Sequence, residues 1–151
     1  MKKYFYTFII ALIIGFFLSY YFIIQYDDYN GIKVSSVADE LYFIQYGVFS
    51  SLESMESETI SLTNYVYSKN DDKYYVYIGI TNNSDNVNKI VSYYKDLGYE
   101  TIIKKYQVNN KNFIESVKEF DNILLETTDK TVINSIINQT LIKYEQEVIN
   151  G

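Results

Sequence analysis

The stretch YFIQYGV, residues 42–48, returns as YYVYIGI at residues 74–80, about 32 positions later in the chain. Both copies are rich in β-branched and aromatic residues, which is typical of β-strands. After the first copy, Ser50 and Glu53 have the spacing of a capping box, which satisfies free N–H groups at a helix start. After the second copy, apolar residues recur at helical spacing: Val87, Ile90, Val91, Tyr94 and Leu97. The sequence therefore predicts a strand–helix unit that occurs twice.

Each predicted helix leads into a further strand. Residues 64–69 (NYVYSK) alternate and end in a turn-prone Asn-Asp-Asp at 70–72, and residues 100–108 (ETIIKKYQV) are rich in β-branched side chains. The element order β-α-β-β-α-β can close as one antiparallel sheet when the crossovers are right-handed. We predict an α+β, ferredoxin-like or RNP-like fold with strand order 4-1-3-2 and helices near 51–62 and 84–97 on one face. The repeated phrase then forms the two central strands.

An uncharged segment precedes this unit. Residues 4–24 contain no charged side chain and are long enough to cross a hydrocarbon layer of about 30 Å as a helix. Lys2 and Lys3 come before the segment, and Asp27 and Asp28 follow it, so the positive-inside rule keeps the N-terminus in the cytoplasm. No small-residue cleavage site follows the apolar run. We predict an uncleaved signal anchor, with a single pass through the cell membrane and an extracytoplasmic C-terminal domain.

Two more helical stretches, joined by the polar segment 125–130, end the chain and predict a helical hairpin. Their apolar stripes need a partner, which could be the sheet, each other or a second chain. The predicted organisation has four parts: a cytoplasmic stub with a transmembrane anchor at 1–24, a linker at 25–40, the sheet domain at 41–109 and the hairpin at 110–151.

The composition narrows the possible chemistry. The chain has no Cys and no His, which removes thiol nucleophiles, the usual zinc ligands and the commonest general base. Its net charge of -6 argues against a nucleic-acid partner, because phosphates require a basic surface. Glu53, Glu56 and Glu58 fit the solvated face of a helix. Asp71 and Asp72 fit a turn better than a metal loop. We therefore expect a protein that is not an enzyme and that has no cofactor and no metal site.

Gln45 interrupts an otherwise apolar strand. Side chains alternate along a strand, so Gln45 faces away from Ile44, and burying an unpaired amide would cost about 1–3 kcal/mol. We expect Ile44 and Val66 to pack under the helices, which leaves the opposite face of the sheet open for a ligand. The predicted ligand-facing set is Phe43, Gln45, Tyr65, Tyr67, Tyr75 and Tyr77.

An amide surrounded by phenol rings is suited to a sugar. The C–H faces of a sugar stack on aromatic rings, and its hydroxyl and acetamido groups need amide and phenol hydrogen bonds. The alternative interpretation is a tyrosine-rich sheet surface that the C-terminal hairpin covers.

The segment from about 41 to 108 resembles the SPOR (sporulation-related repeat) domain, whose halves read roughly y-x-V-Q-V-G-S-F and y-r-V-r-V-G-P-F, each before a helix. The matching residues are Tyr42, Ile44, Gln45, Tyr46, Gly47 and Phe49 in the first half and Tyr74, Val76, Ile78 and Gly79 in the second. The resemblance implies binding of peptidoglycan glycan strands without stem peptides, often at division or sporulation septa. It also places Gln45 at the family's first-strand Gln, on the ligand face. The alternative is a structural module that docks an envelope protein or forms a homodimer through the C-terminal stripes.

Overall fold

The structure is a computed structural model that describes residues 39–150. The predicted anchor at 1–24 and most of the predicted linker at 25–40 lie outside the described residues. Within the described part, no helix is both long enough and apolar enough to cross a membrane.

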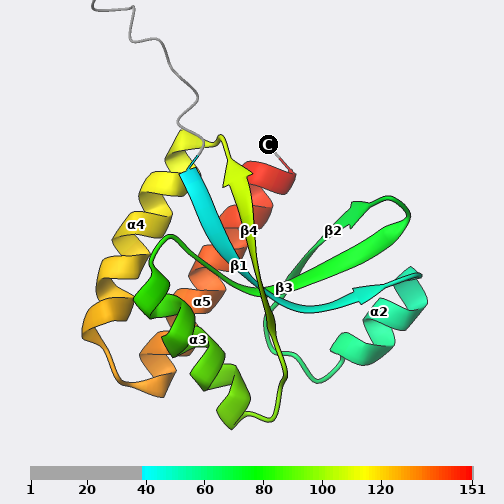
Figure 1. The fold of residues 1–151 in the computed structure, drawn as a ribbon, viewed down its shortest axis with the longest axis horizontal. Helices are drawn as coiled ribbons and strands as arrows, with labels where there is room; N and C mark the ends of the chain where they lie inside the picture. Colours follow the sequence, from blue (N-terminus) through cyan, green and yellow to red (C-terminus); the bar gives the residue numbers. More distant parts are fainter. Residues whose placement is uncertain (1–38, 151) are drawn as a thin grey trace, which may run out of the picture. The chain divides into compact units, whose positions relative to one another are not determined.

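The described chain forms a four-stranded antiparallel sheet and four α-helices (Figure 1). The elements are β1 (Asp39–Phe49), α2 (Leu52–Thr59), β2 (Val66–Asn70), β3 (Lys73–Thr81), α3 (Ser84–Asp96), β4 (Ile102–Val108), α4 (Lys111–Glu126), α5 (Lys130–Tyr144) and the π-helical turn η1 (Glu145–Ile149). The strands lie in the order β2-β3-β1-β4, which confirms the predicted order and the central pairing of the repeated strands. The C-terminal helical pair, α4 and α5, is also confirmed.

Short polar side chains determine where the elements begin and end. The first helix begins one residue later than predicted, because Ser51 and not Ser50 is the N-cap, with its Oγ 3.1 Å from the backbone N of Ser54. Gly98 ends the α3 segment with φ +88°, the left-handed conformation expected of a helix stop. Asp71 and Asp72 both have positive φ, as a two-residue turn between paired strands requires, so β2 and β3 form a tight hairpin.

Two bulges interrupt the central strand pair. Ile44 lies opposite Gly79 and Gln45 lies opposite Tyr77, which leaves Ile78 as an extra residue on β3. A second irregularity follows on β1, between Gln45 and the next paired residue. Each extra residue reverses the alternation of side chains for the rest of the strand. The sheet is therefore bent, and faces assigned by simple alternation do not hold across the bulges.

The regular pairing of β2 with β3 corrects a further prediction. Val66 lies opposite Tyr77, and Tyr67 lies opposite Val76. Cross-strand partners share a face. Tyr67 and Tyr77 therefore lie on opposite faces, and the prediction that they share one is wrong.

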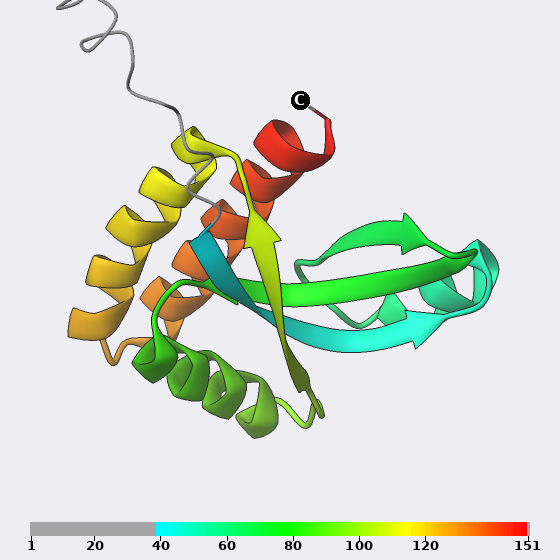
Figure 2. The same cartoon turned by 45° about the horizontal axis from the view of Figure 1, so that its top comes forward.

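Helices pack on both sides of the sheet. On one side, Ile90 of α3 packs against Gly79, and the Tyr94 hydroxyl donates to the Ile78 carbonyl at 2.8 Å. On the other side, the Tyr144 ring of α5 contacts Phe43, with ring centroids 5.2 Å apart. The C-terminal helical pair thus covers part of the face that sequence analysis left open. The sheet and this helical pair share one hydrophobic core. The tip of the β2–β3 hairpin extends away from α4 and α5 (Figure 2).

Candidate functional site

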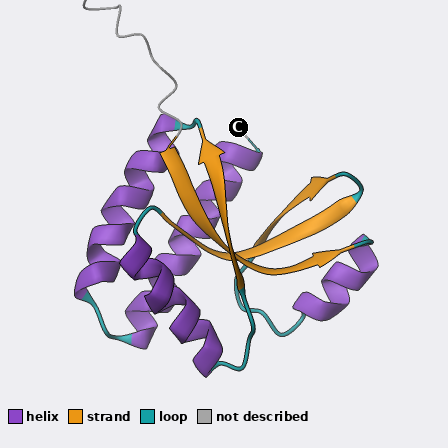
Figure 3. Ribbon diagram, viewed as in Figure 1, coloured by secondary structure: helices purple, strands orange, loops and turns teal. Residues whose placement is uncertain are grey.

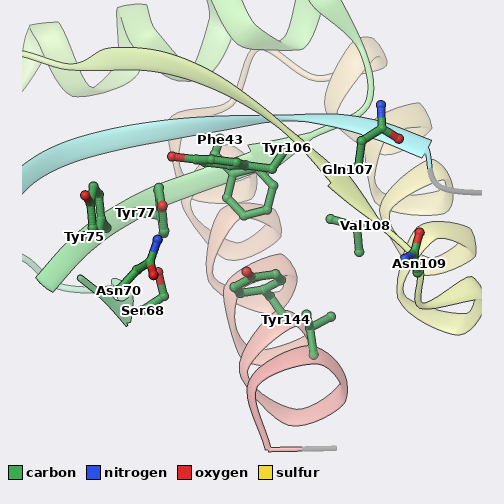
Figure 4. A pocket seen from close by; sticks show the side chains of 11 residues that line it. Phe43, Ser68, Asn70, Tyr75, Tyr77, Tyr106, Gln107, Val108, Asn109 and Tyr144 are labelled. Carbon is green, nitrogen blue, oxygen red and sulfur yellow. The ribbon is translucent and has the colours of Figure 1, made fainter. Parts of the chain in front are cut away.

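A groove of about 380 Å³ lies between the β2–β3 hairpin and the C-terminal end of α5 (Figure 4). We call it the tyrosine groove. Its lining comes from all four strands and from the C-terminal helices: Phe43, Ser68, Asn70, Tyr75, Tyr77, Tyr106, Gln107, Val108, Asn109, Tyr144 and Val148. The volume falls in the range of small-ligand sites, roughly 300–1,000 Å³.

The base of the groove is an aromatic cluster. The Phe43 ring meets the rings of Tyr77, Tyr106 and Tyr144 edge to face, with centroid separations of 5.1, 5.2 and 5.2 Å. Tyr77 also contacts Tyr106 directly, at 5.9 Å. Edge-to-face packing is a favoured geometry for aromatic pairs, and Phe43 and Tyr77 are buried. The base is therefore a packed surface whose shape is set before any ligand arrives.

Polar side chains stand along the groove. Ser68 and Asn70 come from β2 and lie near Tyr75 and Tyr77, while Asn109 follows β4 at the far end (Figure 4). Ser68 lies directly opposite Tyr75 in the strand pair. The groove thus combines hydroxyl and carboxamide groups with exposed aromatic surface. These are the groups that hydrogen-bond a polar, uncharged ligand.

Two phenols of the groove, those of Tyr77 and Tyr144, have raised pKa values. Burial raises the pKa of Tyr77 far above its ordinary value of 10.0, and a hydrogen bond with Tyr106 raises it further. Burial also raises the pKa of Tyr144, with a smaller contribution from the nearby Tyr106. Both hydroxyl groups therefore keep their protons and can donate as well as accept.

Three of the six predicted site residues line the groove: Phe43, Tyr75 and Tyr77. Phe43 belongs to the buried base, Tyr77 is only 4% exposed and Tyr75 is half-buried. Tyr75 is therefore the most accessible of the three predicted aromatic residues. These residues come together because β1 and β3 are neighbours, as the repeat predicts.

Gln45 is not exposed, and this prediction is wrong. Its side chain is buried, with 3% exposure, and its Oε1 atom has no hydrogen-bond partner among the described residues. The prediction assumed an open sheet face, whereas Gln45 lies beside the buried Tyr77 and the Tyr144 ring of α5 packs on the sheet at Phe43. In the strand pair, Gln45 lies directly opposite Tyr77.

Tyr65 and Tyr67 lie outside the groove lining. Tyr65 precedes β2 and packs, half-buried, against the core. Tyr67 is 42% exposed and contacts Tyr74 instead, with ring centroids 6.0 Å apart. The register of the β2–β3 hairpin explains the placement of Tyr67, because the two-residue turn sets Asn70 opposite Lys73 and therefore Tyr67 opposite Val76, on the face away from Tyr77.

Several groove residues were missed by sequence analysis. Tyr106 stands in the predicted fourth strand, and its aromatic type was the only available signal. Tyr144 was assigned to an apolar helical stripe, which is correct but does not reveal that the stripe ends at the sheet. Ser68 and Asn70 became visible as groove residues only once the register of β2 on β3 was known.

A second polar cluster joins the C-terminal helical pair, α4 and α5, to the sheet. The Asp121 carboxylate of α4 is buried and accepts hydrogen bonds from the Thr81 hydroxyl, from the Asn82 backbone N–H at 2.8 Å and from Asn86 Nδ2 at 2.8 Å. Burial raises the pKa of this carboxyl, while the same hydrogen bonds oppose the rise. We call this cluster the Asp121 clasp. Its groups bond one another, so it is a structural joint.

Comparison with known protein families, with curated proteins and with solved structures finds no significant match for this chain.

Proposed function

We propose that this chain is a membrane-anchored, extracytoplasmic SPOR-like module that binds peptidoglycan glycan strands in the tyrosine groove. In this proposal the module is non-catalytic and acts at division or sporulation septa. The strand order β2-β3-β1-β4 supports a ferredoxin-like sheet domain in this proposal. The proposed anchor is a transmembrane helix within residues 1–24, which rests on the uncharged run in the sequence. The observation that carries the proposal is the groove lining, which combines aromatic rings with hydroxyl and carboxamide groups and has no charged side chain.

The chemistry of a glycan is complementary to such a lining. A pyranose presents apolar C–H groups on its faces and hydroxyl groups around its rim, so it needs a ring to stack on and polar groups beside that ring. Tyr75 supplies accessible ring surface, and Ser68 and Asn70 stand next to it. Relative to the sequence prediction, the proposed site moves from the centre of the sheet toward the β2–β3 hairpin, because α5 occupies the centre.

A second function is favoured by a different surface. β4 is an edge strand, and its residues Ile102 and Ile103 are 55% and 47% exposed. An exposed edge with aliphatic side chains is a typical place for strand addition by another chain. The alternative proposal is therefore a structural module that docks an envelope protein or a second copy along β4.

The first test measures wall binding by the full-length chain in detergent micelles. Purified sacculi, with and without amidase treatment to remove stem peptides, are sedimented with wild type, Tyr75→Ala or Tyr67→Ala. We expect wild type to bind the stripped sacculi more tightly. Tyr75→Ala should weaken that binding about fivefold to tenfold, or about 1 kcal/mol, through loss of ring contact.

Tyr67→Ala is the matched control, because it removes an exposed tyrosine of the neighbouring strand outside the groove. Thermal unfolding of both variants checks that the fold is intact. Equal weakening by the two substitutions, or no sedimentation of wild type with sacculi, would contradict the glycan proposal. Self-association that Ile103→Lys abolishes would instead favour docking along β4.

A further inference from the structure

The tyrosine groove is uncharged in a chain that is rich in charge. Asp, Glu and Lys together make up 21% of the sequence, yet none of those within residues 39–150 lines the groove. The polar lining groups are hydroxyls and carboxamides. The phenols of the buried Tyr77 and the half-buried Tyr144 have raised pKa values, so they stay neutral as well.

Several nearby lysines are already engaged with carboxylates of the chain. Lys143 pairs with Glu147 at 2.9 Å on the helical wall, and Lys105 pairs with Glu40 at 2.7 Å on the β4–β1 pair. Two more lysines stand at the rim. Lys73 lies opposite Asn70 and Lys104 lies opposite Phe43, and both are exposed and outside the lining.

This distribution bears on which sugar the groove accepts. A glycan strand without stem peptides alternates N-acetylglucosamine, which is neutral, with N-acetylmuramic acid, whose lactyl group then ends in a free carboxylate. A carboxylate that enters the groove would lose water and find no cation among the lining residues, which is unfavourable. A neutral acetamido sugar loses only hydrogen bonds that hydroxyls and carboxamides can replace.

We propose that the tyrosine groove recognises N-acetylglucosamine units and leaves the lactyl carboxylate of muramic acid in solvent. This inference rests on the proposed glycan-binding function and specifies which sugar is bound. The groove should therefore also bind oligomers of β-1,4-linked N-acetylglucosamine that contain no acidic sugar. Binding should depend little on salt, because no ion pair with the ligand forms.

The test uses the full-length chain in detergent micelles and titration calorimetry with three soluble hexasaccharides. The first is an N-acetylglucosamine hexamer, the second is an amidase-stripped peptidoglycan hexamer, and the third is a glucose hexamer that lacks acetamido groups. We expect the first two to bind with Kd values within about threefold of each other and the glucose hexamer to bind at least about tenfold more weakly. Raising NaCl from 50 to 500 mM should change either Kd by less than about twofold.

Variants separate the groove from its rim. Tyr75→Ala should weaken both acetylated hexamers by the same factor, and Tyr67→Ala should leave both unchanged. The double variant Lys73→Gln/Lys104→Gln should also leave both unchanged. Three outcomes would each overturn the inference. They are binding of the stripped hexamer without binding of the N-acetylglucosamine hexamer, a marked loss of affinity at high salt, and a loss of affinity in the lysine double variant. Those three outcomes are compatible with the proposed glycan-binding function. If neither acetylated hexamer binds, both the inference and the proposed function are overturned. Equal binding of the glucose hexamer overturns recognition of the acetamido group.

Discussion

The two strand–helix repeats begin with the same phrase and differ in what surrounds them. The helix of the first repeat, α2, has eight residues, and only Met55 and Thr59 are buried. The helix of the second repeat, α3, has thirteen residues, of which Asn86, Val87, Ile90 and Tyr94 are buried. α3 contacts α4 and α5, whereas α2 packs on β1 and β3 at the other end of the sheet (Figure 3). The helix of the second repeat thus packs against both the sheet and the C-terminal helical pair.

The two repeats differ in their polar residues as well as in their apolar ones. Thr81 and Asn86 of the second repeat bond the Asp121 clasp. Lys89 Nζ donates to three backbone carbonyls at the end of α4, those of Leu124, Leu125 and Thr127, at 2.5, 3.0 and 2.7 Å. The positions in the first repeat that correspond to Thr81, Asn86 and Lys89 are occupied by Phe49, Ser54 and Ser57. The repeats therefore diverge where the hairpin docks.

The largest expected effect comes from removing the clasp. Asp121→Ala leaves the Thr81 hydroxyl, the Asn82 N–H and one Asn86 N–H without their acceptor, and each buried unpaired donor costs about 1–3 kcal/mol. We expect a loss of about 2–4 kcal/mol in the free energy of unfolding, measured by urea denaturation. Glu119→Ala, an exposed acidic residue on the same helix, is the control and should change little. A loss below about 1 kcal/mol would show that the hairpin does not depend on the clasp.

The clasp also has a pH signature. The raised pKa of Asp121 means that the folded chain binds a proton more readily than the unfolded chain. This carboxyl therefore favours folding most below its ordinary pKa of 3.8, and that contribution is lost as pH rises through the folded pKa. The stability advantage of wild type over Asp121→Asn should shrink as pH increases above 3.8 and then level off. An advantage that grows over this window would contradict the direction of the shift.

A smaller effect compares the repeat-equivalent glycines directly. A Cβ at Gly79 would stand 2.9 Å from Ile90 Cγ2 and 3.5 Å from Ile44 Cδ1, both buried, so Gly79→Ala should destabilise by about 1–3 kcal/mol. A Cβ at Gly47 would meet the ring end of Phe49 at 2.8 Å, but this ring is only half-buried and can swing away. We expect Gly47→Ala to cost less than about 1 kcal/mol.

Thermal and urea unfolding of both glycine variants measure this difference. Because Ile90→Ala removes the clashing methyl, the double variant Gly79→Ala/Ile90→Ala should be less destabilised than the sum of the single changes. Equal losses at the two glycines would remove the contrast between the repeats.

An effect smaller than that of Gly79→Ala concerns Lys89, whose side chain reaches from α3 to the end of α4. Lys89→Met keeps the aliphatic stem and removes three charge-assisted hydrogen bonds at a helix C-terminus, which should cost about 1 kcal/mol. Lys95→Met, at an exposed position on the same helix, is the matched control. Hydrogen exchange should show faster opening at the end of α4 in the Lys89 variant alone. Faster opening in α2 instead would mean that the two repeats are not separately stabilised.

Much of the architecture could be predicted because it depends on local chemistry. The repeated phrase, the polar caps and the Asp71–Asp72 turn act over a few residues, and together they predict the strands, the helices and the strand order. The pairing of β1 with β3 followed from the same repeat. Three of the six predicted site residues, Phe43, Tyr75 and Tyr77, line one groove because they stand on strands whose adjacency the repeat predicts.

Tertiary structure alone decided which face remained available for a ligand. Ile78 became an extra residue in the β1–β3 pairing, and one such residue turns every later side chain to the other face, which the composition of the strands does not reveal. The apolar stripes of α4 and α5 predicted helices but not their partner, since the hydrophobic effect has no direction and any apolar surface can bury a stripe. Their docking placed Tyr144 beside Phe43 and left the groove at the β2–β3 hairpin.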